Sequence, residues 1–321
     1  MPVRVALILA LLGLWAPAVP AMAAPATCKL GVNVAALYDL DPAKGSFGAD
    51  LWLWSLCPDK ELSPLSRVEL PTAKAGLQLG PLQGQAVAGG WYESRQARGM
   101  FRHRWDMRRY PFDRQRLVIR LEESELGAAR LVFAADSKDS FVSAGIGPEL
   151  GEWRVEGFQV AAGTEQEESS YGFPEAEPSR YAWVEAAVVL QRSGMLTFVK
   201  LTLPVFAAAL FAILCLYFDP RQGGSFQNQV PILVAVLFAI IINHRRSDDI
   251  IGDVGRLTLV TEIHLATILL TIVVAVLVFL DRRRAERDEP VRYLDHAAIR
   301  CTAAGYLAVI TLLILWAAFG A

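Results

Sequence analysis

The sequence is poor in the residues that build metal centres and catalytic sites. It has 4 cysteines and 4 histidines among 321 residues, and the histidines lack the spacing of metal ligands. The Gly-x-Ser-x-Gly, His-Glu-x-x-His and phosphate-binding-loop motifs are all missing. We therefore expect a protein that is not an enzyme and that carries no cofactor and no metal.

An excess of charge of either sign is also missing. The chain has 31 Lys and Arg against 33 Asp and Glu, for a formal net charge of -2, and no basic run is interleaved with aromatic residues. Such a chain offers no positive field to a phosphate backbone, so we expect no nucleic-acid partner. In contrast, 54% of the residues are hydrophobic and they are unevenly distributed, which is typical of a multi-domain membrane protein.

Residues 1–24 have the pattern of a cleaved secretory signal, with one arginine, an apolar run and then small residues. The segment that follows is therefore predicted to be exported. Cys28 and Cys57 both lie in it, and an oxidising compartment permits a disulfide between them. The sequence leaves open whether they pair, because pairing depends on geometry. Cys215 and Cys301 lie in apolar segments, where unpaired cysteines act as small hydrophobic residues.

Residues 25–195 contain short runs that alternate between apolar and polar positions, separated by Gly, Pro, Asp and Ser clusters. This alternation is typical of half-buried strands. We expect an extracytoplasmic all-β domain, an immunoglobulin-like sandwich. The tract at 165–180 is acidic, contains proline and has no period, which predicts a solvated loop.

Four apolar segments follow in residues 196–321 and are expected to form a four-helix transmembrane bundle. The helices are predicted at about 196–218, 225–246, 257–280 and 297–319. The first, third and fourth reach the roughly 20 residues that a span needs. The second has an apolar core, 230–242, that covers only about 20 Å as a helix, so it crosses the membrane only with its polar ends included. Polar ends are best placed away from lipid, which makes the second helix the candidate pore lining.

The distribution of arginine predicts the orientation in the membrane. The connections after the first and third apolar segments carry seven arginines, whereas the connection after the second carries three. Cytoplasmic loops carry the excess of Lys and Arg in membrane proteins. The arginine-rich loops are therefore expected inside the cell and the N-terminal domain outside the membrane.

One loop of the exported domain has an unusual composition, because residues 108–115 read RRYPFDRQ. Proline removes a backbone donor and fixes its own φ, and the residue before it is pushed to an extended conformation. The stretch is therefore expected to be a stiff loop between strands. Its Tyr110 and Phe112 need an apolar surface, and its Asp113 needs a cation if it is buried.

This order of features resembles the pentameric ligand-gated ion channels, the Cys-loop receptor superfamily. That family has a secreted β-sandwich, four spans with a polar-ended second one, and an aromatic-Pro-x-Asp loop between two sandwich strands. Animal members bracket the loop with two cysteines, whose positions here are His103 and Leu117; their loss is a feature of bacterial members. The turn at 38–47 and the strand-to-helix segment at 190–204, which contains Arg192, match in the family's order.

The resemblance implies a homo-oligomer of the bacterial inner membrane, a pentamer, that passes ions when a small-molecule or proton agonist binds the exported domain. It also implies that the RRYPFD loop couples the two domains, with Asp113 paired to Arg192 and Asp41 sharing that arginine. A purely structural corner is the alternative role of this loop. The coupling residues that we expect are Asp41, Tyr110, Pro111, Phe112, Asp113 and Arg192.

Helical spacing selects a pore-lining face in the second apolar segment, because residues three or four apart share a face. One phase places Phe238 and Ile242 in a hydrophobic ring that closes the pore by dewetting. A phase shifted by one residue presents Asn228, Ile241 and Arg246 instead. The first phase predicts a pore lined by Gln227, Pro231, Ala235, Phe238, Ile242 and Arg245, with Val234 as the alternative to Ala235.

The sequence departs from the family at both ends of the pore segment. The inner end has amides where bacterial cation channels often have an acid, and the outer end has two arginines directly before two aspartates. Because rings of charge set ion selectivity, the sign of the permeant ion stays open.

The family's Trp-x-Pro-Asp-like motif, which contributes to the ligand site, is missing between residues 56 and 90. Aromatic side chains can still hold an organic cation by cation–π attraction, and Tyr92 and Trp183 belong to this aromatic set. The residues assigned to the ligand site are Trp91, Tyr171, Phe173 and Tyr181. A membrane sensor that keeps the fold without conducting ions is the alternative function.

Overall fold

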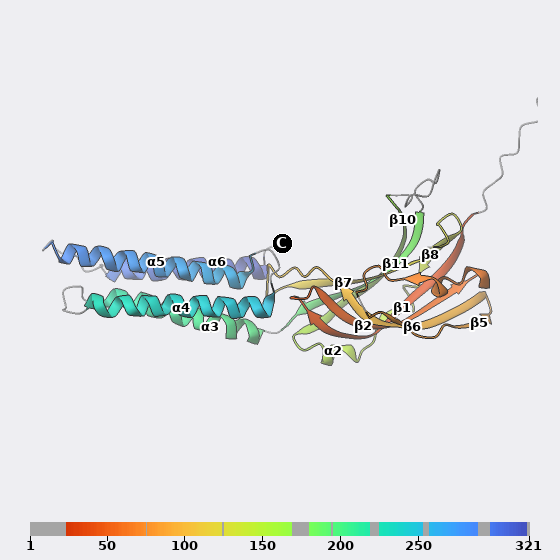
Figure 1. Ribbon diagram of the computed structural model, residues 1–321, viewed down its shortest axis with the longest axis horizontal. Coiled ribbons are helices and arrows are strands. Elements are labelled where there is room, and N and C mark those ends of the chain that lie inside the picture. Colours follow the sequence, from red (N-terminus) through yellow and green to blue (C-terminus); the bar gives the residue numbers. More distant parts are fainter. Residues whose placement is uncertain are drawn as a thin grey trace, which may run out of the picture.

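In the computed structural model the chain is elongated, with a β-domain at one end and a bundle of helices at the other (Figure 1). The structure describes residues 24–74, 76–123, 125–168, 180–193, 195–218, 225–252, 257–287 and 296–319. The predicted signal segment lies outside the described residues up to position 23, and so does the part of the acidic tract at 169–179.

The larger sheet of the β-domain has seven strands, in the order β4-β6-β2-β1-β8, with β5 paired to β6 and β9 paired to β1. β8 and β9 run parallel to β1, and the other pairs are antiparallel. The strands are β1 (Ala26–Asp41), β2 (Ser46–Cys57), β4 (Gln78–Leu79), β5 (Gln83–Val87), β6 (Gly90–Arg102), β8 (Leu131–Ala135) and β9 (Phe141–Val142).

The smaller sheet has four antiparallel strands in the order β10-β11-β7-β3. Its strands are β3 (Val68–Glu69), β7 (Arg114–Glu123), β10 (Trp153–Gln166) and β11 (Arg180–Arg192). Short helical turns lie in the connections: η1 (Lys60–Leu62), η2 (Pro64–Ser66) and α2 (Ile146–Glu149).

Alternating side chains fill the core of the β-domain. In β7, Leu117 and Ile119 are fully buried, and in β2 Leu51 and Leu53 are buried while Trp52 between them is 41% exposed. Successive side chains of a strand point to opposite faces, so each strand contributes one buried row. The predicted order of a sandwich-like β-domain followed by membrane helices is confirmed.

Cys28 and Cys57 form a disulfide, the possibility that the sequence left open. In the antiparallel pairing of β1 with β2, Lys29 lies opposite Leu56, so the cysteines that flank this pair also lie opposite each other. Their Cα atoms are 4.4 Å apart, within reach of a disulfide. With Leu131 they form a small buried cluster of their own.

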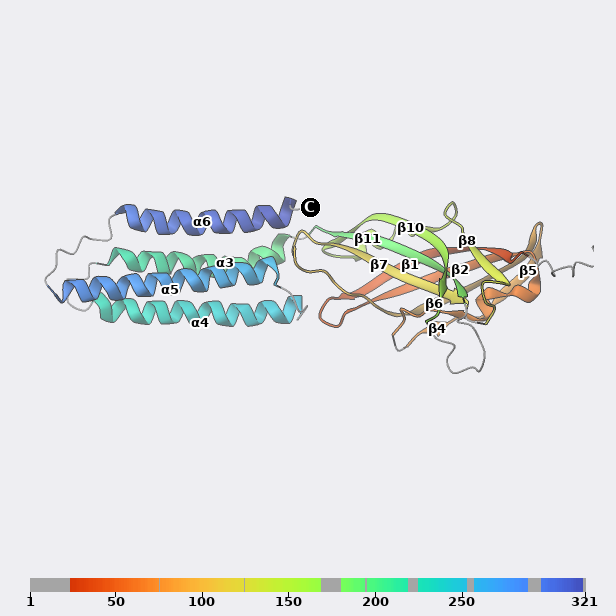
Figure 2. The same ribbon diagram turned by 90° about the horizontal axis from the view of Figure 1, so that it is seen from above.

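Four helices follow the β-domain and lie side by side (Figure 2). They are α3 (Met195–Leu214), which the 3-10 turn η3 (Cys215–Tyr217) continues, α4 (Ser225–Ile251), α5 (Leu259–Ala285) and α6 (His296–Phe319). The helices α3, α4 and α5 pack on one another, and α6 packs on α5 and α3. Within the described part of the chain, these 4 helices are long and apolar enough to cross a membrane.

Two helices extend beyond their predicted ends, since α4 continues past 246 to Ile251 and α5 continues past 280 to Ala285. Polar residues outside the membrane zone can remain helical until a breaker occurs. For α4 the breaker is Gly252, whose φ is +84° and whose amide donates to the Asp248 carbonyl at 2.8 Å. Glycine adopts this left-handed conformation at little cost and ends helices for that reason. Pro231 lies inside α4 without ending it.

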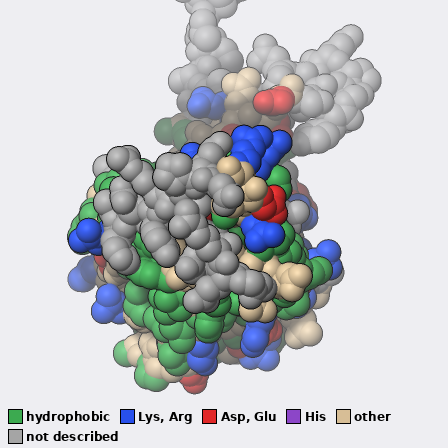
Figure 3. All heavy atoms as spheres, turned by 90° about the vertical axis from the view of Figure 1, so that its left-hand side faces the viewer, with side chains coloured by type: hydrophobic (Ala, Val, Ile, Leu, Met, Phe, Trp, Pro, Cys, Tyr) green, Lys and Arg blue, Asp and Glu red, His purple; other side chains and the backbone are tan. Residues whose placement is uncertain are grey.

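The outer faces of the bundle are covered by large apolar side chains. Examples from three helices are Phe211 (57% exposed), Leu269 (62%) and Leu312 (66%). Seen from the free end of the bundle, the surface is mainly hydrophobic, with Lys and Arg side chains around it (Figure 3). Only lipid or other protein chains can shield so much apolar surface. The protein is therefore a multi-pass membrane protein.

Removal of the disulfide is expected to destabilise the β-domain. The bond joins residues with a sequence separation of 29, and loop-closure entropy for such a loop corresponds to about 3–4 kcal/mol. We expect Cys57→Ser to lower the free energy of unfolding by about this amount, as measured by denaturant unfolding of the purified protein followed by tryptophan fluorescence. Cys301→Ser, which removes an exposed free thiol, is the control. Equal effects of the two substitutions would contradict the prediction.

Candidate functional site

The loop between β6 and β7 lies against the ends of two membrane helices. The Arg108 carbonyl accepts a hydrogen bond from the amide of Leu259, the first residue of α5, at 3.2 Å. Arg109 Nε donates to the carbonyl of Ala317 in the last turn of α6 at 3.0 Å. Carbonyls of a last helical turn lack hydrogen-bond partners within the helix, and the Arg109 side chain supplies a donor for the Ala317 carbonyl. The loop therefore contacts both α5 and α6.

The aromatic residues of this loop are buried between the β-domain and the helices. Tyr110 is 2% exposed and belongs to a hydrophobic cluster that also contains Phe198 and Ile263 of the helices, and Phe112 packs against the same cluster. Burial raises the pKa of Tyr110 to about 12. The peptide bond between Tyr110 and Pro111 is cis. One continuous hydrophobic core thus joins the two halves of the protein.

Arg192, the last residue of β11, is held between two carboxylates. Its Nε donates to Asp113 Oδ1 at 2.8 Å and its Nη1 donates to Glu152 Oε2 at 2.9 Å. The side chains of Asp113 and Arg192 are only 1% and 7% exposed. The structure therefore contains the ion pair between Asp113 and Arg192 that the resemblance implied, and both side chains are largely buried.

Two aromatic rings cover the guanidinium group of Arg192. Its Cζ lies 4.0 Å from the centroid of the Trp153 ring and 4.8 Å from the centroid of the Tyr110 ring. A planar guanidinium can stack on aromatic faces while its edge binds carboxylates, whereas the compact ammonium of lysine cannot do both. Arginine therefore fits this site better than lysine does.

Asp113 is also bound to the beginning of its own loop. Gln115 Nε2 donates to Asp113 Oδ2 at 2.9 Å and to the Asp106 carbonyl at 2.9 Å. Gln115 Oε1 accepts from the Asp106 amide at 3.1 Å and lies 3.3 Å from His103 Nε2. Burial lowers the pKa of His103. The two ends of the loop are thereby held together around the carboxylate that binds Arg192.

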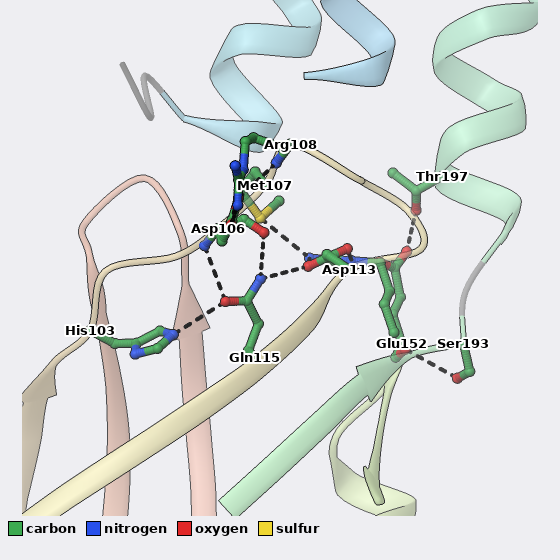
Figure 4. A network of polar contacts seen from close by, with 10 residues as sticks. His103, Asp106, Met107, Arg108, Asp113, Gln115, Glu152, Ser193 and Thr197 are labelled. Atoms are coloured by element: carbon green, nitrogen blue, oxygen red, sulfur yellow. Dashed lines mark hydrogen bonds and ion pairs between the residues drawn. The ribbon is translucent and has the colours of Figure 1, made fainter. Parts of the chain in front are cut away.

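On the other side of Arg192, Glu152 leads to the first membrane helix. The Thr197 hydroxyl, in the first turn of α3, donates to Glu152 Oε1. The Ser193 amide donates to the Glu152 carbonyl at 2.6 Å. Figure 4 shows the bonds of Glu152 to Ser193 and to Thr197 at the start of α3. Through Arg192 these contacts continue to Asp113 in the loop.

Asp41 does not share Arg192, contrary to the prediction. Its Oδ2 lies 2.7 Å from Lys44 Nζ, and its Oδ1 accepts from the Lys44 amide at 2.9 Å. The hydrogen bonds from Lys44 lower the pKa of Asp41. An aspartate that opens a turn bonds to the backbone just ahead of it, and this local arrangement occupies the carboxylate. The turn still contacts the bundle, since a Cβ on Gly252 would lie 2.6 Å from Ala43 Cα.

Glu152 and Trp153 complete the site and were not predicted. Trp153 pairs with Arg192 in the register of β10 with β11, which places its ring on the guanidinium. Nothing in the sequence specifies this register, because the strands are separated by the long acidic tract. The only available signal is that Trp153 opens an alternating run.

Polar residues of α4 that face the bundle find partners inside it. Asn243 Nδ2 lies 3.0 Å from His264 Nε2, and Gln229 Nε2 donates to the Cys215 carbonyl at 2.8 Å. Polar groups at membrane depth must be satisfied within the protein or by water. These contacts fix which face of α4 points inward.

The opposite face of α4 is left open by the rest of the chain. Leu233, Val236 and Ile240 are buried, whereas Phe238 is 62% and Ile242 is 66% exposed. All residues predicted to line the pore are exposed: Gln227, Pro231, Ala235, Phe238, Ile242 and Arg245. The residues of the shifted phase are exposed too: Asn228, Ile241 and Arg246. The open face is broad enough for either helix phase.

The aromatic residues assigned to the ligand site are spread over both sheets. Trp91 lies in β6 of the larger sheet and Tyr181 lies in β11 of the smaller sheet. Lys60 Nζ lies 4.8 Å from the centroid of the Trp91 ring, so the protein already places a cation there. Two of the assigned residues lie outside the described part of the chain: Tyr171 and Phe173.

Comparison with known proteins gives no assignment. No family model matches the chain, and no curated protein matches it significantly. Function is therefore inferred from the residues at the junction and from the open face of α4.

Loss of the Arg192 side chain is expected to be strongly destabilising. Arg192→Ala leaves Asp113 buried without its cation, which costs on the order of 3–5 kcal/mol. The thermal stability of the purified protein in detergent should fall accordingly, and adding Asp113→Asn should restore part of the loss. The control is Arg114→Ala, which breaks an exposed pair with Glu156 and should cost at most about 1 kcal/mol. Equal losses for the two arginine substitutions would contradict the prediction.

Tyr110 is expected to make the protein sensitive to alkali. Its pKa is raised from 10.0 to about 12 by burial, so the folded state holds the phenolic proton more tightly than the unfolded state does. The resulting stability is fully present below pH 10.0 and is lost as the pH rises to about 12, a fall of about 3 kcal/mol. Unfolding free energies of the wild type and of Tyr110→Phe should diverge in this pH range. Parallel pH profiles would show that Tyr110 is not responsible.

Proposed function

We propose that this chain is a subunit of a pentameric ligand-gated ion channel of the bacterial inner membrane. An immunoglobulin-like domain outside the membrane binds the agonist, and α4 lines the pore. The observation that carries this proposal is the buried ion pair of Asp113 and Arg192 at the junction of the two halves, with Glu152 bound to the same arginine.

The junction has the properties that a coupling device needs. Its polar contacts reach α3 through Glu152 and Thr197, and the β6–β7 loop bonds directly to α5 and α6. A ligand shifts a conformational equilibrium only through interactions that differ between the two states. A change in the β-domain that moves this loop or the end of β11 must alter these buried contacts, so it acts on three of the four helices.

The open face of α4 supports the placement of the pore. Around a symmetry axis, copies of α4 would turn Phe238 and Ile242, both well exposed in the single chain, toward the centre. Rings of such apolar side chains close a pore by dewetting. The polar side chains near the two ends of α4 would then face water rather than lipid.

Two observations support the proposed orientation in the membrane. The connections after α3 and α5 carry most of the arginines of the loops, as expected for cytoplasmic loops. The Cys28–Cys57 disulfide of the β-domain suits an oxidising compartment such as the periplasm.

The test is ion flux through the purified protein in liposomes under opposed sodium and chloride gradients, while external pH and a panel of small amines are varied. We expect a gated current whose reversal potential gives the sign of the permeant ion. Phe238→Ala should raise the leak current in the absence of agonist, because it removes the apolar ring. Arg192→Lys should assemble but require about fivefold or more agonist, since lysine keeps the charge and loses the stacking on two rings.

Arg114→Lys is the matched control, because Arg114 forms an exposed ion pair on the same domain, and it should gate like the wild type. Persistent silence of a preparation shown to be pentameric would reject the channel in favour of a non-conducting sensor. Wild-type gating in Arg192→Lys would reject coupling through the junction.

A further inference from the structure

A cavity of about 410 Å³ lies at the junction, beside the contacts of Arg192. Its volume falls within the roughly 300–1,000 Å³ of small-molecule pockets. It is bounded by the end of β1 and the turn after it, by α2 and the start of β10, and by the adjoining ends of α3 and α4. Both halves of the protein therefore contribute to its wall. Of the residues assigned above to the ligand site, the two that the structure describes, Trp91 and Tyr181, do not line it.

A buried phenol without a partner lines this cavity. Tyr110 is 2% exposed, and its hydroxyl makes no hydrogen bond within the described part of the chain. The Thr197 hydroxyl lies near it, but Thr197 donates its proton to Glu152 and so cannot donate to the phenolic oxygen. A buried polar atom left without a partner costs about 1–3 kcal/mol. A ligand that bonds to this oxygen would remove that cost.

The charges around the cavity favour a cation. Asp39 and Glu149 line it, are exposed, and form no salt bridge with any described residue. Together with Asp113 and Glu152 they set four carboxylates against the single guanidinium of Arg192. Asp41 and Lys44 lie nearby, and their opposite charges cancel in an ion pair. Unlike charges attract more strongly where water is partly excluded, so the cavity attracts positive charge.

The walls of the cavity point to an organic cation rather than to a metal ion. Among the described residues, no three His, Cys, Asp or Glu side chains converge as metal ligands. Apolar side chains form much of the lining, and they come from both halves of the protein: Leu37, Met107, Leu150, Trp153 and Ile250. Such a surface suits the hydrocarbon part of an amine.

We propose that this cavity is a binding site for a small primary amine that carries an apolar group. The ammonium group bonds to the Tyr110 hydroxyl and lies near Asp39 and Glu149, while the apolar group packs among the side chains of the wall. An amine in this position contacts the β-domain and the helices at once. Binding at this site does not require that the protein conducts ions.

The experiment is calorimetric titration of the full-length protein in lipid nanodiscs with phenethylamine as the probe. The matched ligand is 2-phenylethanol, which has nearly the same shape and no charge. We expect the amine to bind and the alcohol not to bind at the same concentrations. Tyr110→Phe should weaken the amine about tenfold, as expected for one hydrogen bond to a charged group, and Glu149→Gln about twofold to fivefold.

Two features keep this experiment interpretable. Tyr110→Phe removes only a hydroxyl that has no hydrogen bond in the described chain, so folding should be preserved. Glu61→Gln removes another exposed carboxylate, one that does not line the cavity, and should leave the affinity unchanged.

Failure to detect amine binding would overturn the inference, and a neighbouring subunit that fills the cavity would produce this result. Equal affinities of the wild type, Tyr110→Phe and Glu149→Gln would overturn it too. Loss of binding in Trp91→Ala alone would move the amine to the β-domain. Intact binding in a protein that passes no ions would support this site while rejecting the proposed channel.

Discussion

The structure depends on keeping one largely buried guanidinium group, that of Arg192, paired with carboxylates. A buried charge is tolerated only when partners satisfy it, and Arg192 obtains its partners from the β6–β7 loop and from the start of β10. These segments, together with the end of β11 and the beginning of α3, must therefore meet at one point. This requirement determines how the β-domain is mounted on the helices.

A buried polar group that has no partner in the described chain lies next to this ion pair, and so does a cavity. Next to the satisfied charge of Arg192 lie an unpartnered phenol, that of Tyr110, and a cavity with an excess of carboxylates. Glu152 belongs both to the ion pair and to the cavity wall. A ligand in the cavity would thus alter the same contacts that a movement of the β-domain alters, because both act on one buried set of charges. Ligand binding in the cavity and movement of the β-domain would therefore act through the same residues rather than through two distant sites.

The outer faces of the helices are apolar, and a single chain cannot shield them from water by itself. Lipid suits the apolar faces of α3, α5 and α6, but the polar residues at the ends of α4 need water or protein partners. Residues of α4 such as Gln229 and Asn243 already have partners inside the bundle. In the proposed pentamer, its remaining exposed face would line the pore.

The sequence by itself determined the two-part architecture, because strand alternation and long apolar runs are local properties that burial and the bilayer impose directly. It also indicated that Asp113 needs a cation if it is buried, whereas Arg192 was named as that cation only through the resemblance to the channel family. Only the tertiary structure decided the rest. The register of β1 with β2 brought Cys28 and Cys57 together, and the pairing of β10 with β11 brought Glu152 to the arginine. These pairings join segments far apart in the chain, and a local pattern carries no information about them.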